Sequence, residues 1–323
     1  AWMKKILVRI FGSLLMLAAL ALTIAWFYFN EEHINLDAVT RAQFNESFID
    51  LPGGTVHYEL GGPADGDTVV LVHGFSVPSY IWDPTFEFLA SSGFRVLRFD
   101  LYGRGHSDRP DTDYTFDLFA SQLEQLTAAL GIEAPFKLVG LSMGGPVSTI
   151  FTHQHPERVS QLVLIDPMVV VPSAEDISLL ARPVIGWYLA NVYLLPRLAA
   201  GQTSDFRDKD RFPDWESKFR EQMQYRGFRR AILSTIREWA GADILGEYTK
   251  LGQSGKPVHL FWGREDQTVP LELSKKVLLR VPQARLTVID QAGHLPHYER
   301  PDNFNPLLLE QLTGPGEAPA RAE

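Results

Sequence analysis

The chain has 323 residues, of which 45% are hydrophobic and 21% are charged, and it contains no cysteine. This length and apolar content are enough to bury one sizeable core, so we expect a single domain with an insertion. The formal net charge of −9 argues against nucleic acid as a partner, because binding to phosphate requires a basic face. The absence of cysteine from the sequence excludes disulfides and thiolate sites and leaves the redox compartment undetermined.

The N-terminal residues 1–30 are expected to form a transmembrane signal-anchor. Ile10 to Phe29 is a run of about 20 residues without a charge, enough to cross roughly 30 Å of hydrocarbon as a helix. A cleaved signal peptide is the alternative, but its apolar region usually covers only about 7 to 15 residues. We therefore favour an uncleaved anchor. We give no functional weight to Ala1 and Trp2, which precede Met3 and whose origin the sequence leaves open.

Charges on the two sides of this segment predict its orientation. Basic residues precede it, and Glu31, Glu32 and Asp37 follow it, a distribution that places the N-terminus in the cytoplasm. The rest of the chain then lies beyond the inner membrane, which in a bacterium is the periplasm. Small residues along the segment, such as Gly12 and Ala18, would let two such helices approach closely, so a homodimer through this helix is a further prediction. The basic residues are Lys4, Lys5 and Arg9.

The next part of the chain predicts a linker and the first strands of a sheet. Residues 31–43 are polar and are expected to be a juxtamembrane linker. Phe44 to Asp50 and Thr55 to Leu60 are separated by a Pro-Gly-Gly turn and predict a hairpin. Thr68 to Val72 is a continuous apolar run, typical of a strand buried on both faces of a parallel sheet.

Helices and strands alternate along the following residues. We expect helices over about 79–91 and 114–130, and strands over 95–99, 136–141 and 159–165. The loop from Asp100 to Ser107 contains Gly-Arg-Gly, which lacks the spacing and the lysine of a phosphate-binding P-loop. It is therefore expected to be a packing turn.

A serine bracketed by glycines stands where the strand over 136–141 meets the next helix. Gly140 and Gly144 carry no side chain, so the backbone segments around them can approach closely and the Ser142 hydroxyl can stand clear of the turn. Ser142 is therefore a candidate nucleophile. A serine nucleophile needs a base and an acid, which in this turn architecture follow in the order Asp or Glu, then His.

The acid and the base follow at the ends of two more strand-like runs. The run 258–262 leads to Asp266, and the run 286–289 leads to His294. With these residues the sequence resembles the α/β-hydrolases, with Ser142 as nucleophile, Asp266 as acid and His294 as base. The resemblance covers roughly residues 44–312. Its further motifs are His73-Gly74-Phe75, Phe99 to Ser107, and Leu164-Ile165-Asp166-Pro167.

The resemblance implies an α/β fold in which helices flank a mostly parallel central sheet and a helical cap covers the active site. It also implies an oxyanion hole made by the backbone N–H groups of Phe75 and Met143. The expected divisions are an α/β-hydrolase core over 44–166 and 256–313, a helical cap or lid over 167–255, and a disordered tail over 314–323.

Several other titratable residues are alternatives with less support. Asp166 follows a strand and is a rival acid, because some hydrolases take their acid there, but the loop around Asp266 matches the usual acid loop. His73 is expected to hold its loop, and Glu265 to be a solvated neighbour of the acid. Three further histidines show no convincing metal spacing, so neither a metal nor a cofactor is expected. These are His153, His155 and His297.

The insertion is expected to select the substrate. Ile177 to Ala200 is unusually apolar. It is expected to pack on the catalytic domain, and an acyl-chain pocket or a face that touches the bilayer is an equally supported and compatible expectation. Asp205 to Glu221 is rich in both charges and is expected to be solvated. A helix with one apolar face follows, at Phe228, Ile232, Ile236 and Trp239. Its arginines are expected to form a solvated basic face, with anionic lipid headgroups as the alternative partner; they are Arg226, Arg229, Arg230 and Arg237.

These features together predict a membrane-anchored serine hydrolase of carboxylic esters with a lipid-like substrate. The architecture resembles bacterial membrane-anchored enzymes of the phospholipase A and lysophospholipase type. Epoxide hydrolases and haloalkane dehalogenases share some motifs but use aspartate where this chain has Ser142. Carbon–carbon bond hydrolases and cofactor-free perhydrolases keep a serine and stay open as alternatives. A non-catalytic ligand-binding receptor is the alternative from another class.

Overall fold

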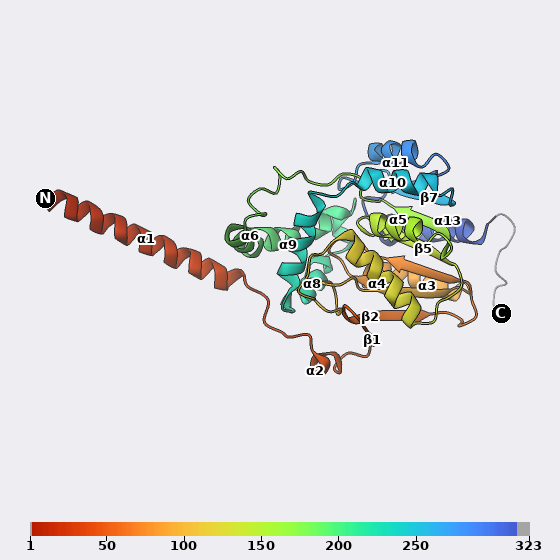
Figure 1. Cartoon of the computed structure of the whole chain (residues 1–323), viewed down its shortest axis with the longest axis horizontal. Helices are drawn as coiled ribbons and strands as arrows, with labels where there is room; N and C mark the ends of the chain where they lie inside the picture. Colours follow the sequence, from red (N-terminus) through yellow and green to blue (C-terminus); the bar gives the residue numbers. More distant parts are fainter. Residues whose placement is uncertain (1, 315–323) are drawn as a thin grey trace.

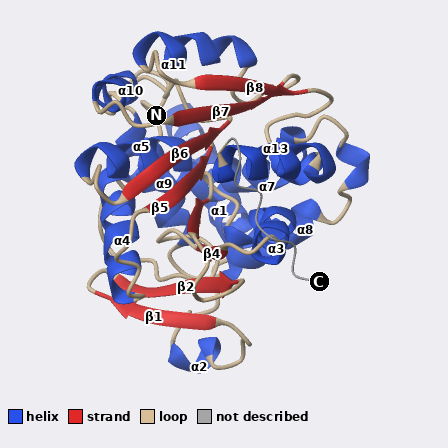
Figure 2. Cartoon of the chain, turned by 90° about the vertical axis from the view of Figure 1, so that its right-hand side faces the viewer, coloured by secondary structure: helices blue, strands red, loops and turns tan. Residues whose placement is uncertain are grey.

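The computed structural model describes residues 2–314, and a sheet of eight strands lies at its centre (Figure 2). The strand order is β1-β2-β4-β3-β5-β6-β7-β8. β2 pairs antiparallel with β1 and with β4, whereas every other neighbouring pair is parallel. The predicted class, a mostly parallel sheet flanked by helices, is confirmed. The strands are β1 (Ser47–Leu51), β2 (Gly54–Gly61), β3 (Thr68–Val72), β4 (Arg95–Phe99), β5 (Phe136–Leu141), β6 (Val159–Ile165), β7 (Val258–Gly263) and β8 (Arg285–Ile289).

Continuous apolar runs form the central strands because both faces of the sheet are covered. Side chains of a strand alternate between the faces, so Val70 and Val72 lie in one core layer and Val69 and Leu71 in the other. The helices around the sheet are α3 (Asp83–Ser91), α4 (Phe116–Ala129), α5 (Gly144–Gln154), α10 (Ile244–Gln253), α11 (Ser274–Arg280), α12 (Pro296–Glu299) and α13 (Pro301–Thr313).

The segment between β6 and β7 forms the remaining helices of the main body. They are α6 (Pro183–Leu189), α7 (Leu195–Gly201), α8 (Trp215–Arg220) and α9 (Phe228–Trp239), and they gather on the side of the body from which the N-terminal helix projects (Figure 1). α10 also lies within the range 167–255 expected for the cap, yet it packs against α5 and α11 beside the sheet. The tail expected over 314–323 lies, apart from Gly314, outside the described residues.

Two expectations about charged parts of this segment are wrong in part, because exposed charged side chains alternate with buried ones. The residues 205–221 are not simply solvated, because Phe206, Trp215 and Phe219 are buried among them. The arginines of α9 do not form a solvated basic face either. Arg229 is buried, with only 6% of its surface exposed, and Arg237 donates a hydrogen bond to the carbonyl of Leu180 at 2.8 Å. Charge density along a sequence therefore does not reveal which side chains neighbouring segments will cover.

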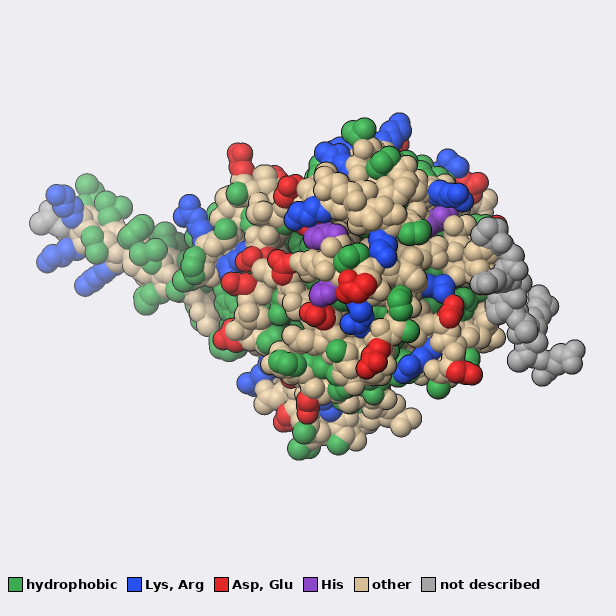
Figure 3. Space-filling model, turned by 45° about the vertical axis from the view of Figure 1, so that its right-hand side comes forward, with side chains coloured by type: hydrophobic (Ala, Val, Ile, Leu, Met, Phe, Trp, Pro, Cys, Tyr) green, Lys and Arg blue, Asp and Glu red, His purple; other side chains and the backbone are tan. Residues whose placement is uncertain are grey.

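The N-terminal helix α1 (Trp2–Phe29) projects from the body and has no buried residue. It is long and apolar enough to cross a membrane. Figure 3 shows hydrophobic side chains along it and basic ones near its N-terminal end. Only its last turns meet the cap, where the Tyr188 hydroxyl donates to the Leu22 carbonyl at 3.0 Å and the Asn191 amide to the Trp26 carbonyl at 2.9 Å.

The linker over 31–43 is docked on the body and contains the short helix α2 (Ala38–Arg41). Glu32 forms an ion pair with the buried Arg229 at 3.2 Å, and Ile34 pairs with Tyr225 in a parallel β-bridge. The linker is thus part of the folded structure.

Candidate active site

Ser142 occupies a sharp turn between β5 and α5. Its φ of 52° lies in the left-handed region, where a residue with a side chain is strained. A Cβ on Gly144 would lie 2.4 Å from the Val72 carbonyl oxygen, and one on Gly140 would lie 2.4 Å from the carbonyl oxygen of Gly144. Both glycines are therefore required for the two backbone segments to approach, as the sequence indicated. The side chain of Ser142 is left at the surface of a cavity.

Asp266 and His294 come from the ends of β7 and β8 and meet beside this turn. The His294 Nδ1 lies 2.7 Å from an Asp266 carboxylate oxygen. The other oxygen of Asp266 accepts the backbone N–H groups of Thr268 and Val269 at 2.8 and 2.9 Å, which fixes the orientation of the carboxylate. No hydrogen bond among the described residues joins Ser142 Oγ to His294, although both line the same cavity. Such bonds often form fully only when a substrate is bound.

The electrostatic surroundings of His294 favour its protonated form. Burial by itself lowers the pKa of this imidazole, but the charge and hydrogen bond of Asp266 and the charge of Asp205 outweigh it, so the pKa lies above its ordinary value. Because Nδ1 donates its proton to Asp266 in the neutral tautomer, Nε2 is left as the proton acceptor. Nε2 is therefore the nitrogen of this imidazole that can accept a proton from a neighbouring group.

The backbone N–H groups of Phe75 and Met143 are available for a ligand. Among the described residues, neither N–H has a hydrogen-bond acceptor. Met143 stands at the start of α5, where the helix dipole adds positive potential. The loop of Phe75 is held by Arg104, a fully buried residue whose Nε donates to the Phe75 carbonyl at 2.7 Å. The sequence marked the loop of Arg104 as a packing turn without revealing this contact.

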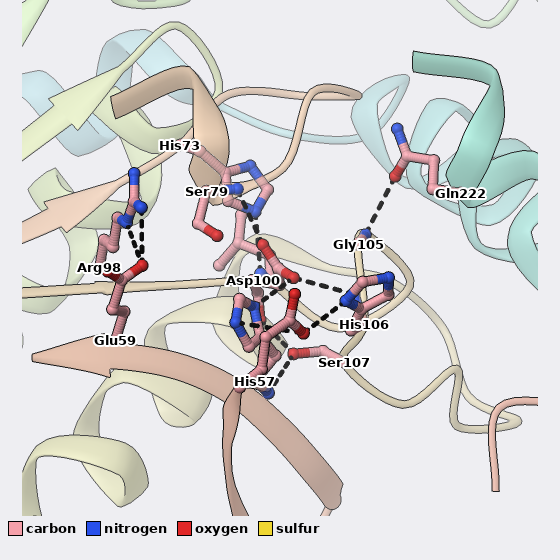
Figure 4. A network of polar contacts seen from close by, with 12 residues as sticks. His57, Glu59, His73, Ser79, Arg98, Asp100, Gly105, His106, Ser107 and Gln222 are labelled. Carbon is pink, nitrogen blue, oxygen red and sulfur yellow. Dashed lines mark hydrogen bonds and ion pairs between the residues drawn. The ribbon is translucent and has the colours of Figure 1, made fainter. Parts of the chain in front are cut away.

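The carboxylate of Asp100 holds the loop after β3 and the loop after β4 together (Figure 4). It accepts hydrogen bonds from the backbone N–H groups of Ser79 and His106, and it pairs with His57 Nδ1 at 2.8 Å. His73 accepts the N–H of Leu101 at 2.9 Å, and burial lowers its pKa to about 4, so it is neutral at pH 7. His73 thus ties the two loops together, as expected, and does not line the cavity of Ser142.

Asp166, the rival acid, lies next to Asp266 without bonding to His294. It is fully buried, its φ is 41°, and one of its oxygens accepts the N–H of Gly263 at 2.9 Å. Burial first, and the neighbouring Asp266 second, raise the pKa of Asp166 well above its ordinary value, which favours its protonated form. The carboxylate that bonds to His294 is Asp266, and Asp166 makes no such bond.

Among the described residues, one group of side chains lies close enough together to share a metal ion: Asp166, Asp266 and His294. Asp266 and His294 are already bonded to each other, and one oxygen of Asp166 accepts the N–H of Gly263, so these ligand atoms already have partners within the chain. The other predicted histidines lie elsewhere, with His153 paired to Glu247 and the buried His297 bonded to a backbone carbonyl. Glu265 is half-buried and accepts the N–H of Ala292 at 3.1 Å.

The cavity at Ser142 has a volume of about 310 Å³ and is shared between the core and the cap. Much of its wall is apolar. The apolar part is formed by Phe75, Val77, Ile81, Leu141, Leu198 and Leu295. Asp205 and Arg197 are contributed by the cap, and Thr268 by the loop of Asp266. The sequence did not indicate that Asp205 would reach the cavity.

A second residue that the sequence did not reveal is Glu299, in α12. Its carboxylate is fully buried and accepts three backbone N–H groups: that of Gly293 at 2.8 Å, that of Asp208 at 2.9 Å and that of Arg207 at 3.1 Å. Gly293 immediately precedes His294, whereas Arg207 and Asp208 belong to the cap. Glu299 therefore joins the loop of the base to the cap across about 90 residues of sequence.

Comparisons with known proteins agree with this geometry. The family model described as alpha/beta hydrolase fold matches residues 67–301. The chain is 29% identical to a 2-hydroxy-6-oxononadienedioate/2-hydroxy-6-oxononatrienedioate hydrolase of Paraburkholderia phymatum. The 275 aligned residues cover 81% of this chain and 93% of that protein. The chain is 28% identical to a 2-hydroxy-6-oxo-6-phenylhexa-2,4-dienoate hydrolase of Comamonas testosteroni, with coverage of 81% and 93%.

Two solved structures are similar in shape over their whole length. The enol-lactonase from Burkholderia xenovorans has a TM-score of 0.72 and 22% identity, with 83% of this chain and 100% of that one covered. A thermophilic esterase from Thermogutta terrifontis has a TM-score of 0.71 and 26% identity, with 83% and 98% covered. By their names, the similar proteins described here are hydrolases of 2-hydroxy-6-oxo acids, an enol-lactonase and an esterase. No phospholipase is among those named here.

Proposed function

The chain belongs to the α/β hydrolase fold family, and from this premise we propose that it is a serine hydrolase that cleaves a bond next to a carbonyl group. One observation carries the proposal: Ser142, on its strained turn, and His294, which is paired with the buried Asp266, line a single cavity. This arrangement of nucleophile, base and orienting acid is the one that acyl transfer requires.

The proposed reaction begins when His294 Nε2 takes the proton of the Ser142 hydroxyl and Oγ attacks the carbonyl carbon. The N–H groups of Phe75 and Met143 bind the oxyanion, and Asp266 stabilises the imidazolium that forms. His294 then gives its proton to the leaving group, which departs and leaves an acyl group on Ser142. Water, deprotonated by His294, attacks that acyl group and restores the hydroxyl.

Within this chemistry we propose a carboxylic ester as the substrate, with an uncharged, lipid-like acyl group of the kind cleaved by phospholipase A, lysophospholipase or carboxylesterase. The supporting observation is the composition of the cavity, which has a largely apolar wall and carries the carboxylate of Asp205 near the base. The apolar helix α1 supports a substrate that partitions into membranes, because it would hold the cavity near lipid.

Carbon–carbon bond hydrolysis is the second candidate, and the curated relatives favour it. The relatives named above act, by their names, on 2-hydroxy-6-oxo acids. The carboxylate of such an acid needs a cationic partner, and among the described residues that line the cavity only Arg197 is an arginine or a lysine. A monocarboxylate fits this arrangement better than a dicarboxylate. A cofactor-free perhydrolase and a non-catalytic receptor have no comparable observation in their favour.

We further propose that α1 anchors the enzyme in the inner membrane with the catalytic domain in the periplasm. The length and hydropathy of α1 and its projection from the body support the anchor. The periplasmic side rests on the charges that flank α1. The dimer through α1 stays a prediction from its small residues.

A substrate panel tests the proposed function. It contains p-nitrophenyl esters, monoacylglycerols, lysophospholipids, diacyl phospholipids and a 2-hydroxy-6-oxo-dienoate, incubated in detergent with the full chain and with Ser142→Ala. We expect fatty acid release from lipid esters by the unmodified chain, and its reduction to background in Ser142→Ala. Ser160→Ala, which alters an exposed serine of β6, is the matched control and should keep full activity.

The panel also separates the candidates. Turnover of the dienoate with no release of fatty acid from any ester would replace the ester by the carbon–carbon bond as substrate. Ester turnover that persists in Ser142→Ala would remove Ser142 as the nucleophile. Circular dichroism of both variants verifies that the substitutions leave the fold intact.

A further inference from the structure

The two charged residues that the cap brings to the cavity differ in how they are held. Arg197 is exposed and its guanidinium lies 3.7 Å from the centroid of the Tyr193 ring, so it can swing into solvent. Asp205 is half-buried and lines the cavity, close enough to His294 for its charge to act on the imidazole. Burial raises the pKa of Asp205 above its ordinary value, while the charge of His294 and the hydrogen bond from Thr268 oppose this effect. The carboxylate of Asp205 is therefore held in the cavity that it shares with Ser142, whereas Arg197 reaches solvent.

Three contacts keep Asp205 in this place. The Thr268 hydroxyl donates to its carboxylate at 2.7 Å, and the backbone N–H of His294 donates to its carbonyl at 2.7 Å. A Cβ on Gly293 would lie 2.5 Å from the same carbonyl, so the backbone of Asp205 is packed directly on the loop of the base. The carboxylate of Glu299 accepts the N–H of Gly293 on one side of this contact and those of Arg207 and Asp208 on the other. These contacts hold Asp205 against the loop of the base.

A fixed carboxylate at this position has a predictable effect on ligands. Two like charges about 8 Å apart at an effective dielectric constant near 20 repel each other enough to change a rate constant by roughly tenfold or more. An uncharged group is not penalised. The apolar side chains of the rest of the wall act in the same direction, because they do not solvate an anion.

We propose that Asp205 is a specificity-determining residue that disfavours substrates with an anionic group inside the cavity and so selects uncharged acyl chains. This inference rests on the proposed function, because it assumes that the acyl group reacting with Ser142 occupies the cavity. It assigns to the cap a chemical role in choosing the substrate, in addition to covering the site.

A pair of covalent probes tests the inference. The probes are two ethyl p-nitrophenyl alkylphosphonates of equal chain length, one with a methyl end and one with a sulfonate end that stays ionised. In the labelling step, Ser142 Oγ forms a bond to phosphorus, p-nitrophenolate leaves with the electrons of the P–O bond, and the hydroxyl proton passes to His294. The readout is the ratio of second-order rate constants for the two probes, measured on the full chain in detergent.

We expect the unmodified chain to react at least about tenfold faster with the uncharged probe, and Asp205→Asn to reduce this ratio at least about fivefold. Asparagine keeps a side-chain oxygen for the Thr268 hydroxyl and the backbone carbonyl for His294, so the fold should be preserved. Asp205→Ala removes the side-chain oxygen as well and makes the same test if Asp205→Asn fails to fold. Asp210→Asn, an exposed carboxylate of the same segment outside the cavity, should leave the ratio unchanged.

The outcomes distinguish this inference from the proposed function. An unchanged ratio in a folded Asp205→Asn or Asp205→Ala chain overturns the role of Asp205 and leaves the serine hydrolase intact. Failure of both probes to label Ser142 in the unmodified chain, read by mass spectrometry of the peptide, overturns the proposed function and the inference with it.

Discussion

The charges around His294 set the pH range in which this imidazole can act as a base. Its pKa is raised above the ordinary value of 6.5 because Asp266 and Asp205 outweigh the effect of burial. A base must be neutral to accept a proton, so kcat/KM should rise with pH through an apparent pKa above 6.5. The acid limb of the pH profile is therefore a direct measure of the carboxylates that surround the imidazole.

Replacing Asp266 by asparagine should change both the rate and this acid limb. Asp266→Asn removes the main cause that raises the pKa of His294 and no longer fixes the productive tautomer. We expect kcat to fall by about 10³ to 10⁴ and the apparent pKa of the acid limb to move down. The measurement is kcat/KM for a p-nitrophenyl ester from pH 5 to pH 9. Asp290→Asn, an exposed carboxylate on the loop before His294, is the control, and an unchanged limb in Asp266→Asn would contradict the assignment of the acid.

Residues with a local signature could be predicted from the sequence, and residues that act through distant contacts could not. Ser142, Asp266 and His294 each follow a strand-like run, so their position at one edge of the sheet follows from the parallel pairing. Asp205 and Glu299 carry no such signature. Their roles depend on where the cap returns to the core, and the sequence does not state that geometry.

At the level of elements, Glu299 joins α12 to the middle of the cap, at Arg207 and Asp208. Glutamine in its place offers one acceptor oxygen and two N–H donors to three backbone N–H groups, so at least one of these would lose its partner. Hydrogen bonds to a buried charged group contribute about 1.5 to 3 kcal/mol each. We expect Glu299→Gln to lower the free energy of unfolding by about 3 kcal/mol. The measurement is urea unfolding of a shortened chain that begins at Asn30 and therefore lacks α1.

The control for this prediction is Glu310→Gln, which changes an exposed glutamate of α13 and should alter stability by less than about 0.5 kcal/mol. A loosened cap should also weaken discrimination between the uncharged and the anionic phosphonate, because Asp205 would gain freedom. If Glu299→Gln and Glu310→Gln unfold at the same urea concentration, Glu299 does not join the cap to the core.

Elements that are buried on both faces were easier to predict than those of the cap. The strands β3, β5, β6 and β7 are made mostly of apolar side chains, so their approximate extent is visible in the sequence. The basic face expected for α9 was wrong because the linker and α6 cover it. Arg229 stacks on Trp26 and Trp187, at 4.6 and 4.8 Å from the ring centroids, and pairs with Glu32.

For the molecule as a whole, the same contacts place the cap beside the end of α1. The apolar segment 177–200, expected to pack on the domain or to face the membrane, contains both buried and exposed apolar side chains. Leu195 and Ala199 are buried, whereas Val184 and Tyr193 are exposed. If α1 spans the bilayer, the exposed side chains of this segment lie close to the lipid surface. The linker therefore fixes the catalytic domain relative to the anchor, through the ion pair of Glu32 with Arg229.

Two truncated chains distinguish the effect of the anchor α1 from the effect of the Glu32–Arg229 ion pair. A chain that begins at Asn30 lacks α1 but keeps Glu32, whereas a chain that begins at Gln43 lacks both. We expect the full chain to sediment with membranes and the chain from Asn30 to stay in solution without detergent. The chain from Gln43 should be less stable than the chain from Asn30 by up to about 3 to 5 kcal/mol, because it loses the linker contacts and leaves Arg229 without its carboxylate.

Arg229→Met in the chain from Gln43 distinguishes the unpaired charge from a general loss of packing. Methionine preserves apolar volume and carries no charge, so it should restore a measurable part of the lost stability there, whereas in the chain from Asn30 it should be destabilising. The measurement is urea unfolding of all four chains. Equal effects of Arg229→Met in both backgrounds would show that Glu32 and Arg229 are not coupled. The linker would then be a tether that leaves the orientation of the domain free.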